Sequence, residues 1–120
     1  MSKFSHLDKK GNVKMVDVTD KPTTERTARA EGKISMKKET LALLLEEELP
    51  KGNVLTTAKL AGIQAAKKTS NLIPLCHPLN VSWVDIEFES EGDHILIKAV
   101  AKTKEATGIE MEVLAAVSVA

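Results

Sequence analysis

Two reactive side chains stand next to each other in a short loop between prolines. Residues 73–79 read IPLCHPL, so Cys76 and His77 lie between Pro74 and Pro78. Proline fixes its own φ and favours extended geometry in the residue before it, so the loop should hold the thiol and the imidazole in few orientations. Histidine can carry a proton near neutral pH, although an imidazole that only hydrogen-bonds a neighbouring carbonyl is commoner. The sequence leaves both roles open for His77.

Two carboxylates follow near the end of the sequence, where residues 107–112 read TGIEME. If this stretch is extended, Glu110 and Glu112 share a face and can accept hydrogen bonds from a guanine-type or pterin ring. If it is helical, the two side chains diverge by about 200° and are ordinary first-turn acids favoured by the helix dipole. The residues alone do not choose between these alternatives.

A cation precedes the start of an expected helix, because Lys51 stands directly before Gly52 and Asn53. The free N–H groups and the dipole of a helix N-terminus favour an anion, so a phosphate could bind there. The sequence has no GxxxxGK[ST] loop, which excludes the nucleotide-binding loop of the large NTPase class. Taken alone, Lys51 is more often a solvated lysine.

The same residues give little support to a metal centre. Cys76 and His77 are adjacent, so their side chains should point to opposite faces of an extended segment. The only other imidazoles are His6 and His94. We therefore expect neither a metal ligand set nor a resident cofactor.

Hydrophobic periodicity predicts the elements of the first half. Residues 25–36 alternate between small or apolar and polar side chains, which indicates a long strand. Residues 37–49 carry leucines at helical spacing and end at Pro50, which indicates an amphipathic helix. A second helix opens at Asn53, a plausible N-cap, and its buried stripe consists mostly of small residues that would allow close packing.

The second half predicts a hairpin and a last helix. Residues 83–89 and 94–102 alternate cleanly around a turn at residues 91–93, and a helix follows over residues 111–120. This order predicts an α+β fold with helices packed on one face of an antiparallel sheet. A split βαββαβ arrangement needs one more strand after the last helix. We therefore expect one domain over residues 1–120 that is incomplete at its C-terminus and lacks its final strand.

Composition narrows the class of protein. The 120 residues are 42% apolar, which is enough for the core of one domain. The chain has one cysteine, no apolar secretory segment and no run of membrane-spanning length, so we expect a cytoplasmic protein with no membrane partner. Only Phe4, Trp83 and Phe88 are aromatic. Such scarcity leaves few platforms for stacked bases, and we expect no nucleic-acid partner.

Four segments together resemble the cyclic pyranopterin monophosphate synthases, the molybdenum cofactor biosynthesis protein C family. They are KMVDV at 14–18, KGNVLTTAKLAGIQAAKKT at 51–69, LIPLCHPL at 72–79 and TGIEMEVLAAVSVA at 107–120. The resemblance spans nearly the whole chain in order, and LIPLCHPL with GxEME is a specific pair, whereas GxEME alone is weak. It implies a ferredoxin-like subunit in a hexamer built as a trimer of dimers, with active sites at the dimer interface.

The resemblance also implies a lyase-type activity. The substrate would be a cyclised dihydroguanosine triphosphate, (8S)-3',8-cyclo-7,8-dihydroguanosine 5'-triphosphate, and the products cyclic pyranopterin monophosphate and pyrophosphate. Such chemistry needs acid–base groups and phosphate clamps. By motif match, the implied catalytic residues are Lys51, His77, Glu110 and Glu112. The implied substrate contacts are Leu75, Cys76, His77, Met111 and Glu112, with Arg26 and Lys67 near the triphosphate.

One departure from the family pattern keeps an alternative open. The family continues past the position of Ala120 with a YDMCKA-like segment, which bears an aspartate and a lysine, and with a glycine-rich tail. This sequence ends before them. The alternative is a catalytically inactive oligomeric fragment that still binds a purine nucleotide.

Overall fold

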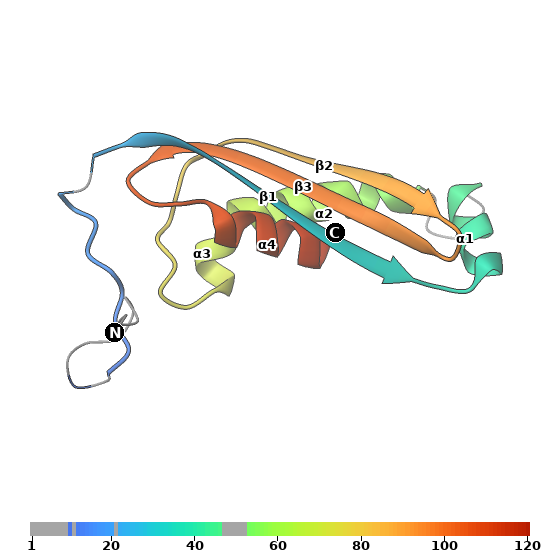
Figure 1. Cartoon of the computed structure of the whole chain (residues 1–120), viewed down its shortest axis with the longest axis horizontal. Coiled ribbons are helices and arrows are strands. Elements are labelled where there is room, and N and C mark those ends of the chain that lie inside the picture. Colours follow the sequence, from blue (N-terminus) through green and yellow to red (C-terminus); the bar gives the residue numbers. More distant parts are fainter. Residues whose placement is uncertain (1–9, 11, 21, 47–52) are drawn as a thin grey trace.

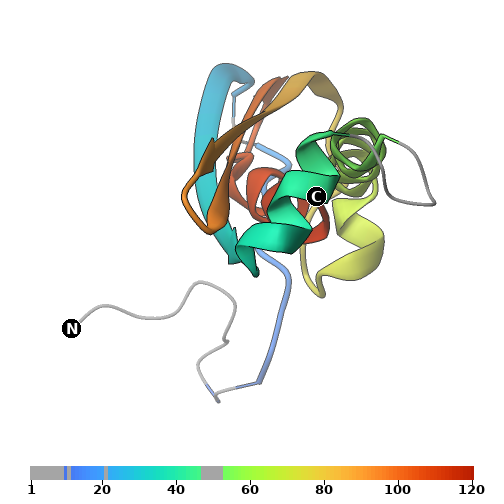
Figure 2. The same ribbon diagram turned by 90° about the vertical axis from the view of Figure 1, so that its right-hand side faces the viewer.

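The computed structural model describes residues 10, 12–20, 22–46 and 53–120. The elements, in order, are β1 (Thr24–Ser35), α1 (Lys38–Leu45), α2 (Val54–Lys67), α3 (Thr69–Leu72), β2 (Val81–Glu91), β3 (His94–Glu105) and α4 (Glu110–Val119). The strands form one layer, and α2 and α4 cover one face of it (Figure 1, Figure 2). This is the α+β, ferredoxin-like arrangement that the sequence predicts.

The sheet has the order β1-β3-β2, and both pairings are antiparallel. Glu91 pairs with His94, so Gly92 and Asp93 form the two-residue turn of the hairpin. Gly92 has a φ of +57°, a conformation that glycine adopts without steric cost. The hairpin therefore forms where the sequence predicts it, and β3 becomes the central strand.

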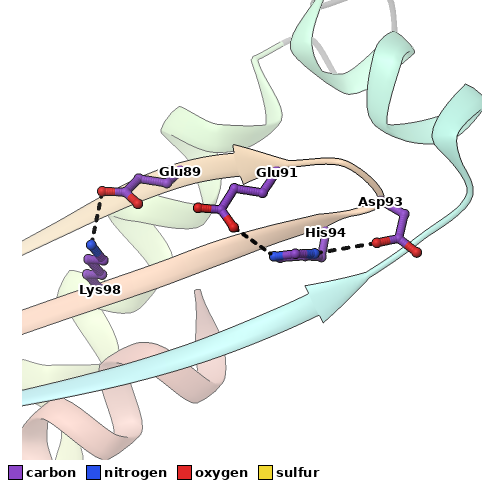
Figure 3. Close-up of polar contacts among 5 residues, drawn as sticks. All are labelled: Glu89, Glu91, Asp93, His94 and Lys98. Atoms are coloured by element: carbon purple, nitrogen blue, oxygen red, sulfur yellow. Dashed lines mark hydrogen bonds and ion pairs between the residues drawn. The ribbon is translucent and has the colours of Figure 1, made fainter.

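The face of the sheet away from the helices is polar. Lys98 of β3 pairs with Glu89 of β2 at 3.0 Å, and His94 lies 3.5 Å from Glu91 and 3.4 Å from Asp93 (Figure 3). These side chains are partly solvated, so the pairs fix the local arrangement more than they stabilise the fold.

The core lies between the sheet and the helices, and α2 packs closely on both. Its N-terminus is capped as predicted, because the Asn53 side chain accepts a hydrogen bond from the Thr56 N–H at 2.9 Å. A Cβ at buried Gly62 would overlap Ile86 of β2 and come within 2.9 Å of the Ala116 carbonyl oxygen of α4. The stripe of small residues therefore allows α2 to approach the sheet and α4, as the sequence predicts.

Two further features concern the helices. The short helix α3 was not predicted, and Thr69 at its start is buried, with its hydroxyl donating to the Ala65 and Ala66 carbonyls at 2.9 and 3.0 Å. Within the described ranges, no helix has both the length and the apolarity needed to cross a membrane.

Candidate active site

A cavity of about 460 Å³ lies where three distant segments meet. The first is the lead-in before β1, the second is the proline loop that precedes β2, and the third runs from the connection after β3 into the first turn of α4. The lining residues are Val16, Val18, Ile73, Pro74, Leu75, Cys76, His77, Leu79, Thr107, Gly108, Glu110, Met111 and Glu112. The fold thus places the thiol and imidazole pair and the two carboxylates around one hollow.

The proline loop turns sharply as it enters the cavity wall. The Cys76 N–H donates to the Ile73 carbonyl at 3.4 Å, with Pro74 and Leu75 between them. Leu75 has a φ of +62°, and a proline followed by a positive φ is the pattern of a type II turn, whose second central residue is usually glycine. A leucine there costs roughly 1–2 kcal/mol of backbone strain. Strain of this kind often marks functional sites, and here it sets the direction in which Cys76 and His77 leave the turn.

Glu112 is a buried acid in the wall of this cavity. Only 2% of its surface is exposed, its Oε2 accepts from the Cys76 thiol at 3.7 Å, and its Oε1 is buried without a hydrogen-bond partner among the described residues. Burial raises the pKa of Glu112, against opposing hydrogen bonds from its own backbone N–H and from Cys76. Burial, followed by the charge of Glu112, raises the pKa of the Cys76 thiol to about 11.

The two predicted carboxylates lie on the first turn of a helix. Because α4 begins at Glu110, the helical alternative is the one observed, and the two side chains differ in burial: Glu110 is exposed and Glu112 is not. Both nevertheless line the cavity. The Glu110 carboxyl lies over the Cα of Gly108, where a Cβ would collide with it. An exposed acid and a buried acid therefore face the same space in different environments.

His77 is held from the other side of the cavity. Its Nε2 lies 2.5 Å from the carbonyl oxygen of Val16, a residue 61 positions earlier in the chain. The sequence analysis assigned neither an element nor a site role to Val16 and Val18, yet both form part of the cavity wall. Their spacing was the available signal, because residues two apart in an extended segment share a face.

The structure brings together most of the predicted site residues but leaves Arg26 and Lys67 outside the cavity wall. Lys51 lies outside the described residues. Arg26 is on the helix-covered face of β1, opposite Thr103, and its Nε is buried without a partner among the described residues. Lys67 is exposed at the end of α2. Neither Arg26 nor Lys67 lines the cavity, and among the described lining residues there is no lysine or arginine.

The described residues contain no group of three or more His, Cys, Asp or Glu side chains placed to hold a metal ion. The site chemistry of the described part therefore consists of one imidazole, one thiol and two carboxyls around a partly apolar hollow. Such a set can accept hydrogen bonds from N–H groups and move protons, since the carboxyls differ in environment.

Comparison with known proteins matches the chain to a family over most of its length. The model of the MoaC family covers residues 15–120. The chain is 64% identical over 117 residues to the "Molybdenum cofactor biosynthesis bifunctional protein" of Chlorobaculum tepidum, with 98% of this chain and 38% of that protein covered. It is also similar to two proteins named "Cyclic pyranopterin monophosphate synthase".

One of these two is from Desulfatibacillum aliphaticivorans, at 57% identity over all of this chain and 77% of that protein. The other is from Oleidesulfovibrio alaskensis, at 53% identity over 99% of this chain and 76% of that protein. This chain thus spans about two fifths of the first relative's length and about three quarters of the other two. The matched residues include all three segments of the cavity wall, and the chain belongs to the MoaC family.

Proposed function

We propose that this chain is a cyclic pyranopterin monophosphate synthase. It would convert the cyclised dihydroguanosine triphosphate into cyclic pyranopterin monophosphate and pyrophosphate, as a step of molybdenum cofactor biosynthesis. The observation that carries the proposal is the meeting of the proline loop and the start of α4 in one cavity, in a chain similar to two proteins named for this activity. In this proposal residues 1–120 act as one domain of that enzyme.

The buried acid suits recognition of a purine-derived ring. Glu112 has an oxygen without a partner among the described residues, and a ring N–H or amino group would supply the missing donor. A donor brought to a buried carboxyl makes a charge-assisted bond that is stronger than a neutral one. Leu75 and Met111 would contribute apolar contacts to the ring from opposite segments of the wall.

The acid–base work would fall to His77, Glu110 and Glu112. Closing a cyclic phosphate requires a sugar hydroxyl to attack the α-phosphorus, with loss of the hydroxyl proton and cleavage of the bond to the β-phosphate. The proton needs an acceptor, and the departing pyrophosphate needs positive charge around it. His77 is the imidazole of the described wall, and imidazole is the side chain that most often serves as general acid or base.

The phosphate-binding cations would come from outside the described wall. A triphosphate brings several negative charges to a cavity that already holds Glu110 and Glu112 and, in its described part, no cation. Lys51 would be the catalytic lysine, and Arg26 and Lys67 would bind phosphates. Arg26 pairs with Thr103 near the end of β3 from which the chain runs on to Thr107 and Gly108 of the cavity wall, and this position supports a role at the triphosphate.

The absence of a lysine or arginine from the described part of the cavity wall also supports an assembly of several protomers. We include in the proposal a hexamer formed as a trimer of dimers, in which a neighbouring protomer completes each site. The exposed apolar side chains of α4 support it, because Met111, Leu114 and Val119 are each more than one-third exposed. Exposed apolar surface can become covered in an assembly. A cytoplasmic location would follow from the pathway.

The test is turnover of the cyclised triphosphate by the purified chain and by a Lys51→Ala variant. Pyrophosphate release and formation of the fluorescent oxidised pterin product are followed together, and native mass spectrometry reports the assembly. We expect both products from the parent chain and loss of both in the variant, with the same mass of assembly. Binding of substrate without pyrophosphate release by the parent would contradict the proposal and favour a binding module.

A further inference from the structure

The contact between His77 and Val16 determines where the histidine carries its proton. A backbone carbonyl oxygen has lone pairs and no hydrogen, so it can only accept. The atom that faces it at 2.5 Å is Nε2 of His77. In the neutral imidazole one nitrogen carries the hydrogen and the other carries a lone pair, so the contact requires the hydrogen on Nε2 and the lone pair on Nδ1.

We infer that the carbonyl of Val16 is a positioning group for His77: it holds the neutral ring as the Nε2–H tautomer, so that Nδ1 is the atom that takes up and returns a proton. Only the role of Nδ1 as the proton carrier rests on the proposed function. The tautomer and the contact belong to the free protein and can be measured without substrate.

The bond to Val16 is compatible with a full proton cycle. Both ring nitrogens carry hydrogen in the cation, so Nε2 donates to Val16 before and after Nδ1 gains a proton. Among the described residues, the hydrogen bond of the His77 ring is the one made through Nε2. The ring can therefore stay in place while a single atom changes its protonation, which is the role that the orienting group plays behind a general base.

Local hydrogen bonds order the segment next to the Val16 carbonyl. The Asp17 carboxylate accepts from the Thr19 N–H at 2.9 Å and from the Thr19 hydroxyl at 2.6 Å, forming a local turn. Those two bonds are the main reason that the pKa of Asp17 is lowered, and the charge of His77 adds a minor part. Val16 and Val18 face the cavity on either side of Asp17. A stretch without helix or strand thus becomes a fixed wall of the site.

The direct test is NMR on the full chain without substrate, labelled with ¹⁵N-histidine and with ¹³C at the valine carbonyls. We expect a through-hydrogen-bond coupling between His77 Nε2 and the Val16 carbonyl carbon, and nitrogen shifts of the Nε2–H tautomer. The coupling should persist in Val13→Ala, a matched control on the same segment whose side chain is 70% exposed and does not line the cavity. Absence of the coupling, or a dominant Nδ1–H tautomer, would overturn the inference.

Two amide variants separate the positioning bond from the proton carrier. In His77→Gln the amide N–H₂ can reach the place of Nε2, whereas in His77→Asn it falls near the place of Nδ1. Hydrogen exchange of peptides covering residues 12–20 should be unchanged in His77→Gln and roughly 2- to 10-fold faster in His77→Asn, the loss expected of one net hydrogen bond. Both variants should lose turnover because neither has a base.

Equal exchange in the two variants would overturn the positioning role. Full activity of His77→Gln would overturn the assignment of Nδ1 as the proton carrier. If the parent chain shows the coupling and the exchange difference but no turnover, the proposed function fails while the positioning of His77 stands.

Discussion

Replacement of Glu112 by glutamine should stabilise the fold while it removes activity. Glu112 is 98% buried, counted from its 2% exposed surface, and its Oε1 has no partner among the described residues. An unmet buried oxygen costs about 1–3 kcal/mol and more when it is charged, so exchanging the carboxylate for a neutral amide of the same shape lowers this cost. The helix dipole stabilises a negative charge in the first turn of α4 by about 0.3–1 kcal/mol, and glutamine would lose this stabilisation. We therefore expect Glu112→Gln to raise the free energy of unfolding by about 1–2 kcal/mol at pH 8.

The pH dependence gives the sign of the effect. Burial raises the pKa of Glu112 above its ordinary value of 4.5, so the folded state holds the proton more tightly than the unfolded state. The parent should lose stability relative to the variant as the pH rises through 4.5, and the difference should stop growing above the raised folded-state pKa. Below 4.5 both states of the parent are protonated, so the two proteins should differ little.

The assay is urea unfolding at pH 4, 6 and 8, supported by thermal melts at one protein concentration, since association shifts the midpoint. A gain of 1 kcal/mol should raise Tm by roughly 3–6 °C for a domain of this size. Glu110→Gln is the matched control, because it removes an exposed acid from the same helical turn and should destabilise by about 0.3–1 kcal/mol. A Glu112→Gln variant that is less stable than the parent, by the same amount at each pH, would refute the reasoning.

Three further predictions follow from the cavity wall and the core. The Cys76 thiol, whose pKa is raised to about 11, should react slowly with a disulfide reagent at pH 8, and Glu112→Gln should speed it at pH 9 by removing the adjacent charge; equal rates would show that the carboxyl does not act on the thiol. Leu75→Gly should be more stable to urea than Leu75→Ala by about 0.5–1 kcal/mol, since only glycine relieves the positive φ; the reverse order would exclude strain. Gly62→Ala should destabilise by about 1–3 kcal/mol through overpacking, and more than Gly32→Ala, whose new Cβ would meet only a movable valine side chain at 3.3 Å; similar losses would contradict the close packing of α2.

Much of the fold could be predicted from local pattern. The alternation in residues 25–36, 83–89 and 94–102 predicts three strands, and they form β1, β2 and β3 with the expected faces inward. Asn53 caps α2 as its type suggests. These predictions succeed because strand period, capping and turn chemistry act over a few residues. The short helix α3 escaped prediction, since its four residues carry no period of their own.

The sequence indicated which residues to consider for the candidate site, but not how they contact one another. The motifs single out Cys76, His77 and Glu112, yet nothing local indicates that a thiol and a carboxyl 36 residues apart would meet. That contact depends on how α4 lies against the sheet, which is a property of the packed core. The contact of the Val16 carbonyl with His77 was missed for the same reason. Every residue has a backbone carbonyl, so no residue type in the sequence indicates which carbonyl will contact a side chain.

The most direct test of the account is an NMR titration of the full chain with the cyclised triphosphate, with labels on His77, Met111 and the lead-in valines. If the cavity binds the substrate, these signals should shift together and saturate at one ligand concentration, while Trp83 on the polar face of the sheet stays unchanged. Saturating shifts at Trp83, with His77 and Met111 unmoved, would contradict the central claim that the three segments form the substrate site.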